Sequence, residues 1–131
     1  MRHTLSVLLP VKDAQATLTA LVHDHLDLAT DLGDHFELLI IDDGSADATS
    51  ELAHELRHDY PQIRVVRHGM PLGREAAIRT GLERSCGEKV IVRDEKGGFR
   101  VLERRPAGQH APSRPARPNY LSRLRDFVLS E

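Results

Sequence analysis

The feature that most constrains the fold is a threefold alternation between short apolar runs and segments of helical periodicity. The four apolar runs lie at 4–11, 36–43, 63–67 and 89–93. The segments between them repeat apolar side chains at helical spacing, at 13–32, 45–60 and 75–84. Alternating strands and helices with short connections favour βαβ units, right-handed crossovers and a parallel sheet. We therefore predict an α/β fold whose mainly parallel sheet has four strands.

The chain changes character after residue 95. Lys96-Gly97-Gly98 separates the fourth run from FRVLERR (99–105), in which apolar and charged residues alternate as in a half-exposed strand. A Gly-Gly between two such runs is the ordinary signal of a β-hairpin. The sequence therefore predicts one added antiparallel strand, which completes a domain over 1–105.

Two further segments follow the predicted domain. Residues 106–118 hold four prolines and predict a stiff, extended linker. Residues 119–131 place apolar side chains at helical spacing, which predicts a C-terminal amphipathic helix. An isolated helix of this length is marginal in water, so we expect its apolar face to dock on the same chain or on a second copy.

The composition limits the class of protein. No apolar stretch reaches the 18 or more residues of a membrane span, and the N-terminal run is too short for a signal-peptide core. The single cysteine, Cys86, excludes an internal disulfide framework and suits a reducing cytoplasm, where we expect the protein. No base partner for Cys86 is visible, so we interpret it as a small residue at a helix end rather than as a nucleophile.

Charge is unevenly distributed along the chain. Residues 1–95 carry 10 Lys and Arg against 17 Asp and Glu, and residues 96–131 carry 8 against 3. An acidic body with a basic tail indicates an anionic partner for the tail. The body of the same chain or of a second copy, in a homodimer, is one candidate. Nucleic acid is the weaker one, because no aromatic residues are interleaved and no known module is present.

Two common nucleotide motifs are broken or absent. GMPLGRE (69–75) is similar to a P-loop, but its glycines are one residue too close, and Arg74 and Glu75 replace the required Lys and Ser/Thr. The G-x-G-x-x-G pattern follows none of the predicted strands. The sequence therefore argues against an ATPase and against a Rossmann dehydrogenase.

HELRH (54–58) matches the H-E-x-x-H signature, in which two histidines bind zinc and the glutamate acts as general base. The spacing puts His54 and His58 on one helical face, but that face lies away from the apolar stripe of the helix. No third ligand is fixed by the sequence, although His68 and Glu75 are conceivable. We therefore interpret HELRH as a solvated polar face, with a zinc hydrolase as the weaker alternative.

The most informative stretch is IIDDGSADAT (40–49). Asp42 and Asp43 end the second strand, and the chain then turns into a helix that Ser45 or Asp47 can cap. In an open α/β sheet the ligand crevice lies outside the carboxyl ends of the strands. The two carboxylates therefore stand where a ligand would bind, and they can accept a base N–H or a ribose hydroxyl. The alternative is that one of the pair only caps the turn and the helix.

Three stretches, in this order and spacing, resemble family 2 glycosyltransferases of the GT-A fold: LSVLLPVKDAQATLTALV, FELLIIDDGSADATSEL and IRVVRHGMPLGREAAIRTGLERSCGEKVIV. The resemblance covers about residues 3–95. Its most specific parts are the D-D-G-S-x-D-x-T block and the later G-x-x-x-A-x-x-x-G-L helix. It implies a three-layer, Rossmann-like GT-A sandwich with a site for a nucleotide-diphospho-sugar.

The resemblance implies roles for seven residues at that site. They would form a base-binding loop (Pro10, Val11, Asp13), recognise uracil and ribose (Asp42, Asp43) and approach the diphosphate (Gly73, Arg74). An arginine beside phosphate is a charge-assisted, often bidentate donor. The first loop of the family usually carries an aromatic residue followed by Asn-Glu, whereas this chain has Lys12-Asp13-Ala14 and lacks the stacking ring.

The resemblance also implies a divalent cation, Mn or Mg, bound by an Asp-x-Asp motif after the fourth strand. Asp94-Glu95-Lys96 stands at that position, so only the first Asp is in place and a cation occupies the second slot. Glu95 can substitute as a ligand, but Lys96 would repel the metal. Asp94 and Glu95 are therefore the metal-binding candidates of a degenerate motif.

The family continues well beyond this motif with an acceptor site and a catalytic base. This chain has instead a hairpin strand, a linker and a helix, and no residue can be assigned as the base. The expected function is therefore that of a truncated, hexosyltransferase-like domain that binds a nucleotide-diphospho-sugar weakly, such as a UDP-sugar, without completing transfer alone. The alternative is a non-catalytic interaction or dimerisation module on the same scaffold.

Overall fold

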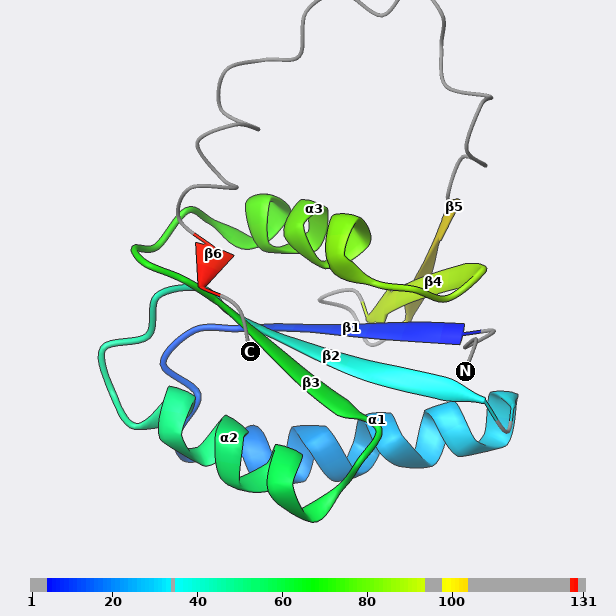
Figure 1. Ribbon diagram of the computed structural model, residues 1–131, viewed down its shortest axis with the longest axis horizontal. Helices are drawn as coiled ribbons and strands as arrows, with labels where there is room; N and C mark the ends of the chain where they lie inside the picture. The colour runs from blue at the N-terminus through cyan, green and yellow to red at the C-terminus, as the bar shows by residue number, and fades with distance from the viewer. Residues whose placement is uncertain (1–4, 34, 94–97, 104–127, 130–131) are drawn as a thin grey trace, which may run out of the picture.

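The computed structural model describes residues 5–33, 35–93, 98–103 and 128–129. Within these ranges a six-stranded sheet lies between two layers of helices (Figure 1). The elements are β1 (Leu5–Val11), α1 (Leu18–Leu32), β2 (Phe36–Asp42), α2 (Thr49–Asp59), β3 (Ile63–His68), α3 (Arg74–Arg84), β4 (Lys89–Arg93), β5 (Phe99–Glu103) and β6 (Val128–Leu129). The predicted three-layer α/β architecture is confirmed. No helix in this part of the chain is long and apolar enough to cross a membrane.

The sheet has the strand order β5-β4-β1-β2-β3-β6. Strands β1 to β4 run parallel, because a helix connects each one to the next. Strand β5 pairs antiparallel with β4, with Phe99 opposite Arg93, so the predicted added strand is present. The residues that connect these two strands, 94–97, lie outside the described ranges. All of β2 is buried, as its continuous apolar centre predicts.

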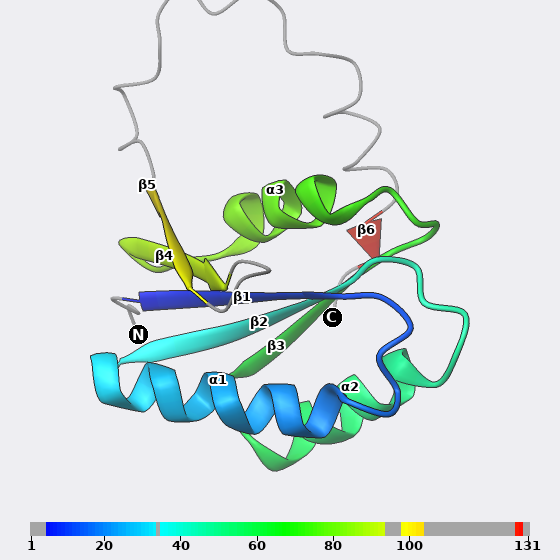
Figure 2. The same ribbon diagram turned by 180° about the vertical axis from the view of Figure 1, so that it is seen from behind.

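Among the described residues, two helices cover one face of the sheet and one helix covers the other. α1 and α2 pack on one face and α3 on the other (Figures 1 and 2), and each face has its own buried apolar cluster. Gly81 lets α3 approach the sheet closely, because a Cβ there would lie 2.9 Å from side-chain methyls of Ile41 and Leu8. The position of α3 matters for function, since the helix begins at the carboxyl edge of the sheet.

The inward side of α1 contains a histidine that the apolar pattern did not predict. His25 is 2% exposed, whereas Leu32, the last apolar residue of the predicted helical segment 13–32, is 57% exposed in the last turn. His25 Nδ1 lies 2.7 Å from the Leu21 carbonyl oxygen. Burial lowers the pKa of His25 below its ordinary value, and the bond to Leu21 opposes this only in part.

The C-terminal segment is described at two residues only. The predicted linker, 106–118, lies outside the described ranges, as do residues 119–127 of the predicted helix. Val128 and Leu129 form β6, which pairs antiparallel with β3 opposite His68 and Arg67. At these two positions the structure has a strand where the sequence predicts a helix. Backbone pairing with the edge of β3 takes precedence there over the helical spacing of the side chains.

Candidate functional site

A cavity of about 280 Å³ opens where β1 and β2 end and α3 begins. Parallel α/β sheets hold their ligands at this carboxyl edge. Of the seven residues predicted for a nucleotide site, five line the cavity, and Asp13 and Asp42 do not. The lining contains two further residues that were not predicted for the site, Lys12 and Ala77. Its full set is Pro10, Val11, Lys12, Asp43, Gly73, Arg74 and Ala77.

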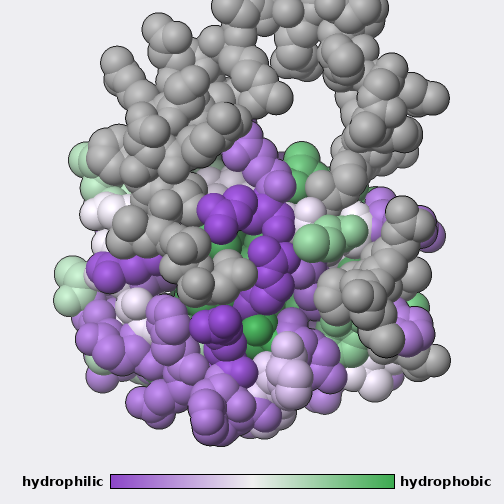
Figure 3. All heavy atoms as spheres, viewed as in Figure 1, coloured by the Kyte–Doolittle hydropathy of each residue, from purple (hydrophilic) through white to green (hydrophobic). Residues whose placement is uncertain are grey.

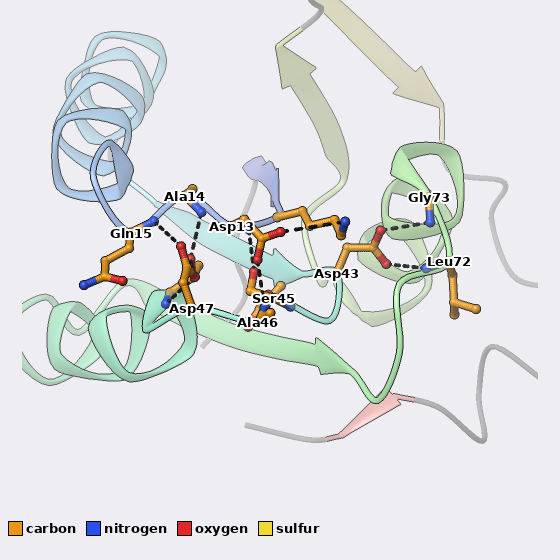
Figure 4. A network of polar contacts seen from close by, with 12 residues as sticks. Asp13, Ala14, Gln15, Asp43, Ser45, Ala46, Asp47, Leu72 and Gly73 are labelled. Atoms are coloured by element: carbon orange, nitrogen blue, oxygen red, sulfur yellow. Dashed lines mark hydrogen bonds and ion pairs between the residues drawn. The ribbon is translucent and has the colours of Figure 1, made fainter.

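Asp43 is buried, and three donors surround its carboxylate. Oδ1 accepts the Leu72 N–H at 2.8 Å, and Oδ2 accepts the Gly73 N–H at 2.8 Å. The side chain points away from Asp13 and toward the start of α3 (Figure 4). A negative charge is favourable at a helix N-terminus, so Asp43 both lines the cavity and holds the loop that leads into α3.

The third donor to Asp43 is His68, a residue that no local motif marks. His68 is fully buried, and its Nδ1 lies 2.7 Å from Asp43 Oδ1. Nδ1–H donates to the carboxylate, and Nε2 lies 2.8 Å from the Thr80 hydroxyl. Thr80 is 2% exposed, so this Asp-His-Thr chain has no hydroxyl open to a substrate. It connects β2, β3 and α3 behind the cavity.

Asp42 is buried beneath the turn that follows β2. Its Oδ1 accepts the Ser45 N–H at 3.0 Å and closes the turn. Its Oδ2 lies 3.7 Å from Arg67 Nε, and neither atom has a hydrogen-bond partner among the described residues. Arg67 also donates to the Ser45 carbonyl at 3.4 Å. Asp42 therefore shapes the loop beside the cavity and does not line it.

Asp13 ties the loop after β1 to the loop after β2. Its N–H donates to Ser45 Oγ at 2.8 Å, and its Oδ1 accepts the Ala46 N–H at 2.7 Å. Its φ of 51° lies in the left-handed region, which aspartate tolerates better than most residues. These contacts fix the backbone that carries the cavity residues before it (Figure 4).

The same two loops are joined a second time, through Asp47. Its Oδ2 accepts the Gln15 N–H at 3.2 Å, and its Oδ1 accepts the Thr49 N–H at 2.9 Å. The Thr49 hydroxyl also donates to Asp47, and this bond is the main cause that lowers the pKa of the Asp47 carboxyl. Thr49 Oγ1 in turn accepts the Ala14 N–H at 2.8 Å. The N-cap residue of α2 is Ala48, not Ser45 or Asp47 as predicted. Asp47 instead binds the first residue of the helix and holds the first loop.

Gly73 and Arg74 form the opposite side of the lining, at the start of α3. Gly73 has a φ of 104°, which favours glycine. The Arg74 guanidinium donates from one terminal nitrogen to the Arg93 carbonyl oxygen at the end of β4. Among the described residues the guanidinium has no other hydrogen bond, so its remaining N–H groups can serve an anion in the cavity. Arg74 is thus a cation whose position is fixed by the sheet.

The predicted metal ligands, Asp94 and Glu95, lie outside the described ranges, directly after β4 ends at Arg93. Within those ranges no group of three His, Cys, Asp or Glu side chains is arranged to hold a metal ion. His54, Glu55 and His58 of the HELRH motif are exposed on α2. The outer side of that helix is hydrophilic (Figure 3).

A third buried carboxylate lies at the other end of β2, away from the cavity. Glu37 is 1% exposed, and its Oε1 accepts Arg64 Nη1–H at 2.6 Å. Its Oε2 accepts the Ser6 hydroxyl and the Cys86 N–H, each at 2.6 Å. The Gly87 N–H donates to Ser6 Oγ at 2.7 Å. No sequence motif marks this cluster, because Glu37 stands inside an apolar run.

Comparison with known proteins identifies similar sequences over most of the described domain. The family model described as glycosyl transferase family 2 matches residues 6–95. An undecaprenyl-phosphate 4-deoxy-4-formamido-L-arabinose transferase of Pseudomonas aeruginosa is 34% identical over 91 residues, which are 69% of this chain and 27% of that protein. A dolichyl-phosphate beta-glucosyltransferase of Trichomonas vaginalis is 31% identical over 68 residues, 52% of this chain and 20% of that protein. The chain therefore spans about a quarter of the length of these relatives.

Solved structures support the same fold. TarS (residues 1–349) of S. aureus superposes with a TM-score of 0.56 at 23% identity, over 68% of this chain and 26% of that one. The mannosyltransferase PcManGT of Pyrobaculum calidifontis, in complex with GDP-Man and Mn²⁺, superposes with a TM-score of 0.55 at 23% identity, over 72% and 28%.

Proposed function

Because the chain belongs to glycosyl transferase family 2, we propose that its cavity binds the nucleotide part of a nucleotide-diphospho-sugar. One observation carries the proposal. Five residues that the family resemblance assigns to the nucleotide come from three separate segments of the chain, and they line one cavity at the carboxyl edge of the sheet. This is the edge at which parallel α/β sheets bind ligands.

The lining has the chemistry that a nucleotide needs. Pro10, Val11 and Ala77 supply apolar contact for a base or ribose, while Lys12 and Arg74 supply positive charge for phosphate. A volume of about 280 Å³ lies near the lower end of ligand pockets, which run from about 300 to 1,000 Å³. The cavity therefore suits the nucleotide better than the whole sugar nucleotide.

Asp43 keeps one acceptor position for the ligand. A carboxylate offers about four lone-pair sites, and Leu72, Gly73 and His68 use three of them. The fourth belongs to Oδ2 and suits a ribose hydroxyl or a base N–H. Asp13 and Asp42 act from behind the lining, by holding its loops.

Relatives of known structure support the class of ligand. TarS is solved in complex with UDP-GlcNAc, and PcManGT with GDP-Man and Mn²⁺. We propose UDP as the nucleotide for this chain. Mn or Mg remains the proposed cofactor, with Asp94 and Glu95 as its ligands and Lys96 weakening the site.

We propose binding without transfer for these 131 residues. Inverting transfer needs a general base for the acceptor hydroxyl, and no residue of the described ranges can be assigned that role. The proposed location is the cytoplasm, where the lone Cys86 stays reduced.

Calorimetric titration with UDP, with and without Mn, tests the proposal. We expect binding that Arg74→Gln weakens about tenfold or more, since a charge-assisted phosphate contact is lost. Arg84→Gln, at the far end of the same helix, is the matched control and leaves the affinity unchanged. The absence of heat at millimolar UDP under both conditions would contradict the proposal.

A second candidate, dimerisation on the same scaffold, is favoured by one observation. Phe99 and Val101 of the edge strand β5 are 45% and 65% exposed. The segment proposed to mediate the dimer, 106–131, lies almost wholly outside the described ranges. Light scattering decides: a dimer that becomes monomeric on deletion of that segment supports this candidate, and a monomer in both forms rejects it.

A further inference from the structure

Lys12 is the cavity residue that neither the sequence motifs nor the predicted site included. It follows the last residue of β1, and its side chain is 50% exposed. Among the described residues its one ion-pair partner is Asp13, whose Oδ2 lies 3.7 Å from Nζ. An exposed pair at this distance contributes little, so the ammonium group is available to a ligand.

The charges around the cavity favour an anion. Two cations line it, Lys12 and Arg74, and they come from the loop after β1 and from the start of α3. The single carboxylate of the lining, Asp43, is already surrounded by two backbone N–H groups and His68. Two cations against one carboxylate leave the lining with a net positive charge, and Asp13, which does not line the cavity, pairs with Lys12 only at 3.7 Å.

We propose that Lys12 is a second phosphate-binding residue, and that Lys12 and Arg74 together hold a nucleoside diphosphate in this cavity before any divalent cation is bound. This rests on the proposed nucleotide-binding function. Two side-chain cations carry the same total charge as one Mn²⁺ or Mg²⁺ ion. Arg74 offers a fixed, forked donor and Lys12 a mobile point charge, which is a combination suited to two adjacent phosphates.

The sequence after β4 makes this arrangement physically useful. Lys96 stands where the family motif places its second metal-binding carboxylate. A site whose metal affinity is weakened by a cation needs another source of positive charge for the diphosphate. Lys12 provides that charge from the loop in which the family usually carries an aromatic residue.

The test is calorimetry on the full chain in buffer with EDTA, using UDP and uridine as paired probes. We expect UDP to bind without metal and more tightly than uridine. Lys12→Gln should weaken UDP about tenfold or more, because one charged phosphate contact is lost, and should leave uridine unchanged. Lys12→Arg should restore most of the UDP affinity. Lys89→Gln, an exposed lysine at the start of β4 and hence at the opposite edge of the sheet, is the matched control and should bind UDP as the wild type does.

The outcomes separate this inference from the function on which it rests. Equal UDP affinity in wild type and Lys12→Gln, or UDP binding only after Mn is added, overturns the role of Lys12 and leaves nucleotide binding intact. Failure of the wild type to bind either UDP or uridine overturns the nucleotide site, and the role of Lys12 falls with it. A parallel loss of UDP and uridine affinity in Lys12→Gln also counts against a phosphate contact.

Discussion

The two ends of strand β2 pair a buried carboxylate with an arginine of β3 in opposite ways. At the start of the strand, Glu37 contacts Arg64 at 2.6 Å, and both of its oxygens are hydrogen-bonded. At the end, Asp42 Oδ2 stands 3.7 Å from Arg67 Nε, and both atoms lack a hydrogen-bond partner within the described residues. The amino end is thus a completed structural cluster. The carboxyl end, where the cavity lies, keeps one buried acceptor and one buried donor without a hydrogen bond among the described residues.

This difference has an energetic meaning. A buried polar atom without a partner costs about 1–3 kcal/mol, so a fold tolerates few of them. The amino end avoids that cost through a close backbone approach, with the Cys86 and Gly87 N–H groups turned into the cluster. At the carboxyl end this cost is not avoided, and the atoms that lack a hydrogen bond within the described ranges lie beside the proposed ligand site.

The largest expected effect comes from Glu37→Gln. The partners of Glu37 are all donors, so the amide NH2 of glutamine must face another donor in a buried place. We expect a loss of about 3 kcal/mol in the free energy of unfolding, measured by urea denaturation. A loss below about 1 kcal/mol would show that the cluster at the amino end is not what holds that end together.

Glycine substitutions near the two ends of β2 should cause the next largest losses in the free energy of unfolding. A Cβ on Gly44 would lie 2.6 Å from backbone atoms of Met70 and Pro71, and its φ of 70° adds strain for alanine. A Cβ on Gly87 would lie 2.6 Å from the Ser6 nitrogen without that strain. We expect Gly44→Ala to cost about 2–3 kcal/mol and Gly87→Ala about 1–2 kcal/mol, by thermal or urea unfolding. The reverse order would place the tighter backbone packing at the amino end.

The pH dependence of stability offers a third test. Burial acts to raise the pKa of Glu37, but the bonds from Ser6, Cys86 and Arg64 outweigh it and hold the pKa below the ordinary value of 4.5. A carboxyl with a lowered folded-state pKa stabilises fully above pH 4.5, and this contribution is lost as the pH falls through the folded pKa. The stability difference between wild type and Glu37→Gln should therefore be constant near neutral pH and narrow in acid. A difference that stays constant in acid would exclude Glu37 as the titrating group.

The smallest expected effect belongs to Asp42→Asn. Asparagine retains an oxygen for the Ser45 N–H and removes a buried charge whose partner is distant. We expect a change of at most about 1 kcal/mol in urea unfolding. A loss as large as that of Glu37→Gln would erase the contrast between the two ends and make Asp42 a structural anchor of equal weight.

Much of the fold follows from the sequence, because periodicity reports which side of an element is buried. The apolar runs and the helical stripes predicted the alternation and the parallel sheet, and the Gly-Gly break before an alternating run predicted the added strand β5. The pattern failed at Val128 and Leu129, where pairing with the edge of β3 decides the conformation. It also failed at Leu32, whose apolar character does not show that the last turn of α1 is exposed.

The candidate site was predicted as a set of residues and not as a geometry. Asp42 and Asp43 were expected together at the ligand edge, with a capping role for one of them as the alternative. In the structure Asp42 closes the turn after β2, and Asp43 lines the cavity. Lys12 was seen only as a departure from the expected aromatic residue, and His68 only as a remote zinc ligand. In the structure His68 contacts Asp43, and Lys12 lines the cavity. The segments that bring them there are far apart in the sequence, so local spacing cannot predict these positions.

The sequence by itself determined the succession of strands and helices along the chain, the edge of the sheet proposed for a ligand and the family of the chain, since these depend on local periodicity and short motifs. Only the tertiary structure decided that both oxygens of Glu37 are hydrogen-bonded while Oδ2 of Asp42 has no partner among the described residues, and that Lys12 lines the cavity. The physical reason is that a hydrogen bond requires a partner within about 3 Å, and such partners come from segments far apart in the chain. Glu37 with Cys86, and Lys12 with Arg74, are brought together by the packing of α3 on the sheet.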